Sequence, residues 1–200
     1  MIIMANWAIT DYVIEGPKDT LQKIKDAIAH HEVAEGSSDG WEGNILNALN
    51  ISYEKQTIQQ NGDHLEITGY YMRGFIKDEA WFDDGTLRFY AEEAWGVTDF
   101  YKVLEKEFPE IKVFYKVEEP DDCVYATNDK DGKYFPERFY VDICYKGNYE
   151  SEYFIFEDAV YKWINEITAS EISTAEEVEA FNDANENGED FIHVYEFDVL

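Results

Sequence analysis

Asp129, Asp131 and Gly132 have the spacing of part of a calcium-binding loop. If Gly132 takes the sixth position of such a loop, the two aspartates take the third and fifth positions. Position one would then be Thr127 and position twelve Arg138, and neither supplies the carboxylate oxygen that a hard cation requires. We therefore predict a turn between two strands at this place, and we expect no metal or other cofactor.

The four histidines do not have the spacing of metal ligands. His30 and His31 are adjacent, so in a helix they point to different sides and cannot bind one metal ion. They lie where a helix is expected to end, a position that favours cationic side chains. His64 and His193 are isolated on expected strands, where surface or cross-strand roles are typical.

Cys123 and Cys144 are the only cysteines. Two cysteines are too few for a disulfide framework, and both lie in strand-like apolar runs, so we expect two free, buried thiols and a reducing compartment. No basic start with an apolar run opens the chain, and no stretch approaches the eighteen apolar residues of a membrane helix. These observations predict a cytoplasmic protein without a membrane partner, whose true start is either Met1 or Met4.

The chain contains 44 Asp and Glu residues but only 16 Lys and Arg, which gives a net charge of −28, while 16% of its residues are aromatic. Because disordered acidic segments are poor in aromatic residues, this composition indicates a folded protein with a negative surface. Such a surface repels nucleic acid and anionic lipid, so the expected partner is a protein, and a basic one is favoured. The oligomeric state of this chain is left open.

Carboxylate chemistry and phosphate binding both lack a specific motif. Acidic pairs such as Glu92-Glu93 and Glu118-Glu119 are so numerous that a catalytic pair could not be distinguished among them. The glycines of residues 36–43 precede a short helix, but no lysine follows them as in a phosphate-binding loop. A hydrolase that uses carboxylates is therefore an alternative without a defined site, and we name no catalytic residue.

Tyrosine is the commonest aromatic residue, with fifteen occurrences. Several tyrosines fall on expected strands beside Asp and Glu, where rigid rings supply contact area and carboxylates attract a basic partner. Half-buried rings in a strand-rich protein are the simpler explanation of this pattern. The candidate interaction surface consists of Tyr140, Tyr145, Tyr149 and Tyr153.

Hydrophobic periodicity predicts an α+β protein. Up to residue 117 the expected elements are a strand at 6–14, helices at 17–31 and 41–49, strands at 64–76 and 86–94, a helix at 98–108 and a strand at 111–117. Without the short helix, this is the β-α-β-β-α-β order of a ferredoxin-like split β-α-β sandwich with an antiparallel sheet.

The remaining third adds strands and helices. Strands are expected at 123–127, 138–145, 152–156 and 191–199, and helices at 158–167 and 174–181, the second opened by a capping box that begins at Thr174. We expect residues 1–128 to form a ferredoxin-like region and residues 129–200 an α+β extension packed into the same compact unit, since no linker separates them.

Three short motifs carry a resemblance to a known family. They are Met4-Ala-Asn-Trp7 before a strand that ends at Gly16, Trp41-x-Gly43-Asn44 after the first helix, and Glu93-Ala-Trp95-Gly96 between a strand and a helix. In this order they resemble the YubB-type ferredoxin-like family of small bacterial, plasmid and phage-associated proteins of unknown function, over roughly residues 4–128. The resemblance implies the fold and a bacterial setting, and it assigns no catalytic or binding residue.

Together these features predict a non-catalytic protein-binding module. One alternative is an acidic inhibitor, immunity protein or nucleic-acid mimic that neutralises a basic partner. A hydrolase with carboxylate catalysis and a structural scaffold are two further candidates.

Overall fold

The computed structural model describes residues 6–61, 64–185 and 188–200, and the chain divides into two compact units between Val124 and Tyr125. Both units combine helices with mostly antiparallel strands, which confirms the α+β class. The predicted boundary at residue 128 lies close to this division. The packing of the two parts into one compact unit stays a prediction, and both candidate start residues lie outside the described ranges.

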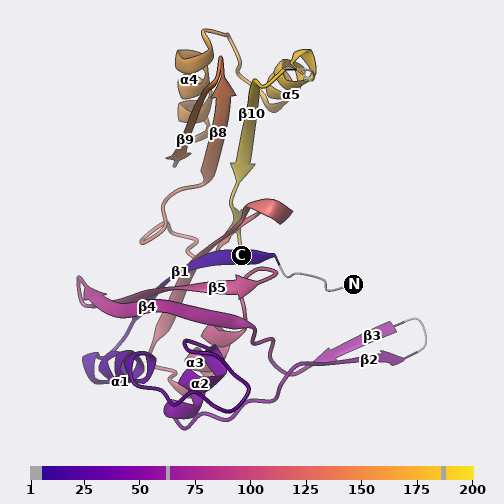
Figure 1. Ribbon diagram of the computed structural model, residues 1–200. Coiled ribbons are helices and arrows are strands. Elements are labelled where there is room, and N and C mark those ends of the chain that lie inside the picture. The colour runs from indigo at the N-terminus through magenta and orange to yellow at the C-terminus, as the bar shows by residue number, and fades with distance from the viewer. Residues whose placement is uncertain (1–5, 62–63, 186–187) are drawn as a thin grey trace. The chain divides into compact units, whose positions relative to one another are not determined.

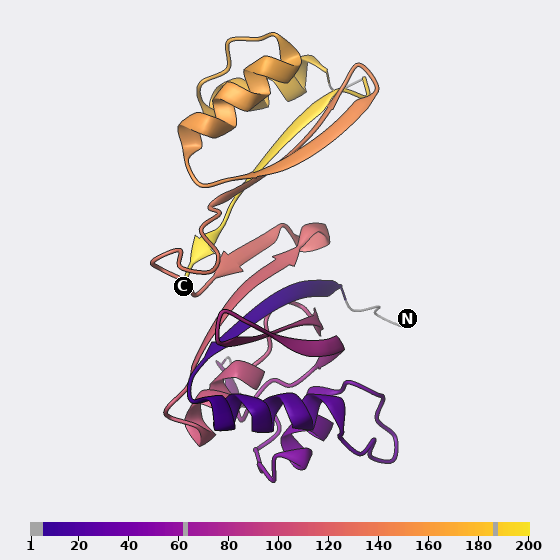
Figure 2. The same cartoon turned by 90° about the vertical axis from the view of Figure 1, so that its left-hand side faces the viewer.

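The N-terminal unit is built on strand β1, which pairs antiparallel with both β5 and β6, while β4 pairs antiparallel with β5. The resulting strand order is β6-β1-β5-β4, and the helices of this unit lie on one face of the sheet (Figures 1 and 2). The elements are β1 (Trp7–Glu15), α1 (Lys18–Ala29), α2 (Glu42–Ala48), β2 (Thr57–Asn61), β3 (His64–Thr68), β4 (Gly74–Asp83), β5 (Thr86–Ala94), α3 (Phe100–Glu107), β6 (Lys112–Glu119) and a 3₁₀ turn (Pro120–Asp122).

Local sequence explains several of these elements directly. Pro17 immediately precedes α1, whose buried side chains have the 3.6-residue spacing of one helix face. Asp84 and Gly85 both have positive φ values, 46° and 80°, which suit the tight turn that joins β4 to β5. The helix face buried on α1 consists of Leu21, Ile24, Ala27 and Ile28, as its spacing predicts.

The expected single strand at 64–76 is wrong. Its first half, β3, pairs with β2 in a separate hairpin, whereas only its end belongs to β4 in the main sheet. The chain changes direction at Gly69, which has a φ of 79° and approaches the backbone oxygen of Lys55 so closely that a Cβ would lie 2.5 Å from it. A strand composition alone does not reveal such a break, because both halves remain extended.

The C-terminal unit is a helix-covered three-stranded sheet with a short parallel strand pair. Central strand β8 pairs antiparallel with β10 on one side and β9 on the other, and β11 pairs parallel with β7. The elements are β7 (Val124–Thr127), β8 (Phe139–Tyr145), β9 (Asn148–Phe154), α4 (Glu157–Thr168), α5 (Ala175–Ala184), β10 (Phe191–Glu196) and β11 (Asp198–Val199). The core between sheet and helices is formed by Val141, Ile143, Val160, Ile164, Ile172, Val178 and Ile192.

Two expectations for this region need correction. The last strand, expected at 191–199, is divided at Phe197 into β10 and β11. Cys123 was expected to be buried in a strand, but it is exposed and has a left-handed backbone with a φ of 54° just after the 3₁₀ turn. Cys144 is half-buried, and both thiols are free, as predicted.

The segment with calcium-loop spacing is organised by hydrogen bonds. The Oδ2 atom of Asp129 accepts the backbone N–H groups of Tyr134 at 2.6 Å and Phe135 at 2.9 Å. Arg138 donates to the backbone oxygens of Phe135 and Asp129 at 2.7 and 3.0 Å. Burial acts to raise the pKa of Asp129, but the backbone donors outweigh it and lower the pKa. Within the described ranges, no three His, Cys, Asp or Glu side chains are grouped as metal ligands.

A buried hydroxyl and two buried carboxyl groups connect distant parts of the N-terminal unit. Glu42 and Glu93 are both 0% exposed, and the Thr98 hydroxyl oxygen lies 2.7 Å from the Oε1 atom of each. Oε1 of Glu93 also accepts the Tyr12 hydroxyl at 2.8 Å and the Thr98 backbone N–H at 3.0 Å. A Cβ on Gly74 would lie 2.3 Å from Oε1 of Glu42, so only glycine fits beside this group.

Hydrogen counting assigns the proton in this network. The Thr98 hydroxyl has a single hydrogen and can donate to only one carboxyl group, so its other short contact needs a hydrogen on that carboxyl. Glu93 receives two further donors, so we take it as the acceptor of the Thr98 hydroxyl hydrogen. Burial and the neighbouring Glu93 raise the pKa of Glu42 well above its usual value. We assign Glu42 as the neutral acid and Glu93 as the carboxylate.

The assignment predicts how stability depends on pH. The pKa of Glu42 is higher in the folded than in the unfolded protein, so its contribution is fully present below the ordinary pKa of 4.5 and is lost as pH rises toward the folded value. Replacing Glu42 by Gln removes this titration. We expect the difference in unfolding free energy, Glu42→Gln minus wild type, to increase from pH 5 to pH 8 by about 1 kcal/mol or more.

Urea denaturation at several pH values measures this difference. Glu54→Gln is the control, because Glu54 is exposed. If the unfolding free energies of wild type and Glu42→Gln changed with pH in parallel, the assignment of the proton to Glu42 would be contradicted.

Candidate functional site

The three-stranded sheet of the C-terminal unit has one face covered by helices and one face without helices, called the open face. At one end of the open face the buried Tyr125 ring stacks on Tyr140 and Tyr195, with centroids 5.7 and 4.5 Å apart. Val141 and Ile143 of β8 point toward helices α4 and α5, so the alternating residues Tyr140, Asp142 and Cys144 point to the opposite face. Strand pairing extends this open face into three rows across β9, β8 and β10. The rows are Tyr153, Tyr140 and Tyr195; Ser151, Asp142 and His193; and Tyr149, Cys144 and Phe191.

Aromatic rings cover most of the open face. The ring centroids of Tyr140 and Tyr153 are 4.9 Å apart, and those of Tyr140 and Tyr195 are 6.1 Å apart. Along β10, Phe191 stacks on His193 at 4.6 Å, and Tyr149 of β9 meets Phe191 edge to face at 6.3 Å. The rings therefore form a nearly continuous surface of rigid, flat groups, of which Tyr149 is 60% exposed.

Asp142 lies in the middle row of this aromatic surface. Its Oδ2 atom accepts the Tyr149 hydroxyl at 3.2 Å, and its Oδ1 atom lies 3.3 Å from Nδ1 of His193. Partial burial of the hydroxyl, together with the negative charge of Asp142, raises the pKa of Tyr149 to about 12. A single carboxylate surrounded by rings provides both a charge and π faces for a cation.

The structure brings together three of the four tyrosines proposed from sequence. Tyr140, Tyr149 and Tyr153 share the open face, but Tyr145 packs against Phe181 of α5 on the covered face, with ring centroids 6.3 Å apart. Tyr145 therefore lies outside the candidate surface. The cause is the two-residue turn between β8 and β9, which places Tyr145 and Tyr149 on opposite faces of the hairpin.

Sequence reasoning missed the residues of β10 and the central carboxylate. The run Phe191-Ile-His-Val-Tyr195 alternates between ring-bearing residues and aliphatic residues, and this period of two was the available signal. Asp142 was hidden among the many acidic residues, because only the pairing of β8 with both neighbours places it between Ser151 and His193.

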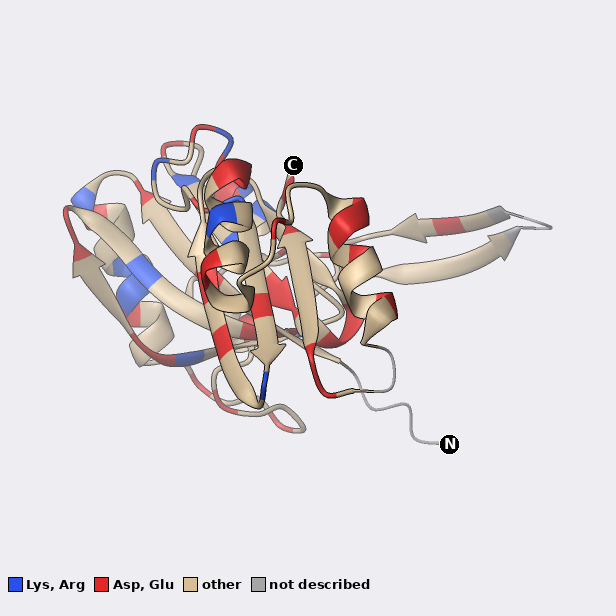
Figure 3. Cartoon of the chain, turned by 90° about the horizontal axis from the view of Figure 1, so that it is seen from above, with Lys and Arg blue, Asp and Glu red and all other residues tan. Residues whose placement is uncertain are grey.

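The charge of this unit is strongly negative. Residues 125–200 contain nineteen acidic and five basic residues, a net charge of −14. Acidic positions recur along both helices and on the strands (Figure 3). None of the nine residues on the open face is Lys or Arg. The surface is therefore suited to cationic groups and unsuited to phosphate.

The contact between Tyr149 and Asp142 predicts a titration. In Asp142→Asn, the carboxylate charge that opposes ionisation of Tyr149 is lost, so the pKa of Tyr149 should fall from about 12 toward its ordinary value of 10.0. NMR of protein labelled at the tyrosine Cζ atoms measures the pKa of Tyr149. Asp158→Asn is the control, because Asp158 is an exposed residue of α4. An unchanged Tyr149 titration in Asp142→Asn would show that this charge does not act on the hydroxyl.

Comparisons with known proteins give no match for this chain, whether with protein-family models, with curated proteins or with solved structures.

Proposed function

We propose that the protein is a non-catalytic binding module whose C-terminal unit holds a basic protein segment against the open aromatic face. The observation that supports this most is the position of Asp142 among the rings of Tyr149, His193 and their neighbours. A guanidinium or ammonium group can stack on such rings and pair with the carboxylate. Each ring contact with a cation is worth about 0.5–2 kcal/mol.

The charge of the unit supports a basic partner over a nucleic acid. Stacked bases are also bound by aromatic sheet faces, but those sites use Lys and Arg along the phosphate backbone. The open face lacks such residues and belongs to a unit with a net charge of −14. Carboxylates around the face attract and orient a cationic partner before contact.

A second candidate function is neutralisation of a basic nuclease or DNA-binding protein by carboxylates that occupy the positions of phosphates. The net charge of −28 favours this acidic inhibitor or mimic. In that case the affinity for the basic partner is determined by many carboxylates distributed over the surface, and the aromatic face adds little to it. The two candidates therefore differ in which variants weaken binding.

The hydrolase alternative has less support. It requires a carboxyl group with a raised pKa in a cleft. Burial raises the pKa of Asp11, Glu42 and Glu119, and that of Glu42 lies well above its ordinary value. However, Glu42 and its partner Glu93 are completely buried, so a substrate cannot reach them without opening the core. Their hydrogen bonds explain a role in holding the N-terminal unit together.

We further propose that the N-terminal unit is ferredoxin-like and similar to the YubB-type family. When the hairpin β2–β3 is left aside, the sheet order β6-β1-β5-β4 and the antiparallel pairing of each neighbouring pair support this arrangement. The three motifs also meet in space: Trp95 donates its backbone N–H to Asn6 at 3.1 Å, and Trp7 and Trp41 both pack on Phe75.

A cytoplasmic location is proposed on the two free thiols, which a reducing compartment maintains. In the part of the chain that the structure describes, no helix has both the length and the apolar character needed to cross a membrane.

Binding of a defined basic peptide tests the proposal. An arginine-rich peptide labelled with a fluorophore is titrated with the full chain, and the affinity is measured at low and high salt by fluorescence anisotropy. The double variant Tyr149→Ala/Tyr153→Ala removes two exposed rings and should weaken binding by about tenfold or more. Phe156→Ala is the matched control, because Phe156 is 67% exposed and lies outside the three strands.

The salt dependence separates the two candidates. If the aromatic face binds the peptide, the loss caused by the double variant persists at high salt, where screening weakens exposed charge pairs. Equal affinity of the double variant, the control and wild type would contradict the aromatic site and favour the acidic mimic. A double variant that no longer shows the wild-type circular dichroism is replaced by Tyr149→Leu/Tyr153→Leu.

A further inference from the structure

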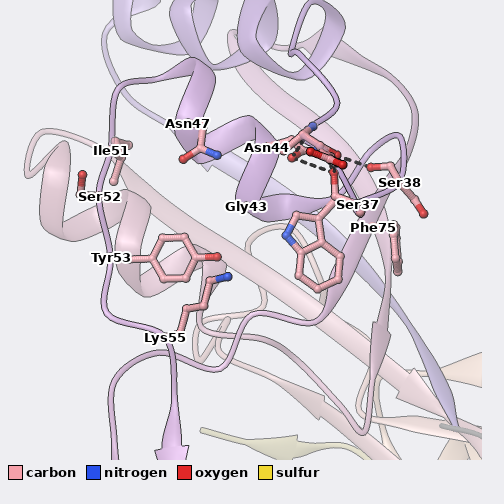
Figure 4. Close-up of a pocket in the computed structure, with 14 residues that line it drawn as sticks. Ser37, Ser38, Gly43, Asn44, Asn47, Ile51, Ser52, Tyr53, Lys55 and Phe75 are labelled. Carbon is pink, nitrogen blue, oxygen red and sulfur yellow. Dashed lines mark hydrogen bonds between the residues drawn. The ribbon is translucent and has the colours of Figure 1, made fainter.

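A second candidate ligand site lies in the N-terminal unit, in a cavity of about 550 Å³ between the loop before α2 and the segment that follows it. This volume is in the range of cavities that bind small molecules. Figure 4 shows that Asn44 and Asn47 of α2, Tyr53 and Lys55 of the following segment, and Phe75 of β4 surround it.

The loop side of the cavity is held rigidly. The amide group of Asn44 donates to the Ser37 hydroxyl at 2.9 Å and to the Ser38 backbone oxygen at 3.0 Å. Asn44 is only 2% exposed, so its hydrogen bonds serve the loop. One wall is therefore preformed, as is usual for small-molecule sites.

Gly43 keeps open the point where two polar groups of the cavity converge. A Cβ built on Gly43 would lie 2.4 Å from Nε1 of Trp41 and 2.9 Å from the Tyr53 hydroxyl oxygen. The backbone of Gly43 is helical, so this position requires glycine for space and not for its conformational freedom. Any side chain here would displace the indole or the hydroxyl.

The Tyr53 hydroxyl has a hydrogen available for a ligand. Its oxygen lies near the indole N–H of Trp41, and since an indole N–H can only donate, the Tyr53 oxygen can act only as an acceptor toward that group. Among the described residues we find no acceptor for the hydroxyl hydrogen. Burial raises the pKa of Tyr53, so the hydroxyl remains a donor at neutral pH.

Lys55 supplies a cation to the same cavity. Figure 4 shows its ammonium group and the Tyr53 hydroxyl both extending from their strand-like segment toward the cavity. Of the residues that line the cavity, only Glu35 and Lys55 are charged, so the lining is neutral in a protein with a net charge of −28. The described residues include no carboxylate paired with Lys55.

An aromatic wall completes the cavity. Trp41 and Phe75 meet edge to face, with centroids 5.3 Å apart and an interplanar angle of 74°. Such a wall favours a flat, apolar body, while the hydroxyl and the ammonium group favour an anionic head.

We infer that this cavity binds a small planar carboxylate, with the carboxylate held by Tyr53 and Lys55 and the ring lying against Trp41 and Phe75. The site is independent of the aromatic face of the C-terminal unit, so either site can exist without the other.

Benzoate is the probe, and benzamide is its neutral counterpart of the same shape. Binding is followed by ¹H–¹⁵N NMR of the full chain at the indole N–H of Trp41, assigned with Trp41→Phe, and at the backbone N–H of Gly43. We expect a saturable shift with benzoate and a much smaller one with benzamide. Lys55→Met should weaken benzoate binding by about tenfold, and Tyr53→Phe by about fivefold.

Lys18→Met is the matched control, since Lys18 is an exposed lysine at the start of α1 outside the cavity, and it should leave the affinity unchanged. Each variant is compared with wild type at signals far from the cavity to establish that it is folded. The inference is overturned if benzoate gives no saturable shift at Trp41 and Gly43, if benzamide binds equally well, or if Lys55→Met binds like Lys18→Met. Equal binding of inorganic phosphate and benzoate would overturn the assignment of a planar ligand.

Discussion

The N-terminal unit depends on accommodating two carboxyl groups in its interior, where both are 0% exposed. Glu42 and Glu93 come from α2 and β5, and the hydroxyl between them belongs to the segment that leads into α3. A buried charge without partners is very costly, so one proton and several short hydrogen bonds are needed to keep both groups inside. The same bonds hold Tyr12 of β1 against these segments. The polar network thus specifies which helix lies over which strands, a role that apolar packing performs less selectively.

The two units differ in which polar and aromatic groups they bury and which they expose. In the N-terminal unit, the carboxyl groups of Glu42 and Glu93 are buried, with Glu42 next to Gly74, and aromatic rings such as Trp41 line a cavity. In the C-terminal unit, the helices cover one face of the sheet, and on the other face Tyr149 and Tyr153 remain exposed, while Tyr140 and Tyr195 are half-buried. Among the described residues, neither arrangement groups three side chains that could hold a metal ion.

The sequence predicted elements better than it predicted sites, for physical reasons. The spacing of apolar residues by three and four positions was sufficient to predict the buried face of α1. Thr174 caps α5, as predicted, by accepting the Glu177 backbone N–H at 3.3 Å. These are local interactions. Which tyrosines share a face depends on strand register, so Tyr145 and Tyr149 could not be separated without knowing the turn between them. The proton on Glu42 depends on a residue 56 positions away, Thr98, and no local pattern reports it.

The central position of β1 also has a consequence for how the chain acquires its structure. Ile9 lies opposite Glu92 on one side and Glu118 on the other, so both partners of the first strand come from far along the chain. During synthesis β1 has no sheet neighbour until β5 has been made, and its second edge stays unpaired until β6 follows. Long-range pairing of this kind is slow, whereas the β8–β9 hairpin closes through a turn of two residues. Strand β1 therefore keeps one unpaired edge until β6 has been made, and an unpaired strand edge is prone to aggregation.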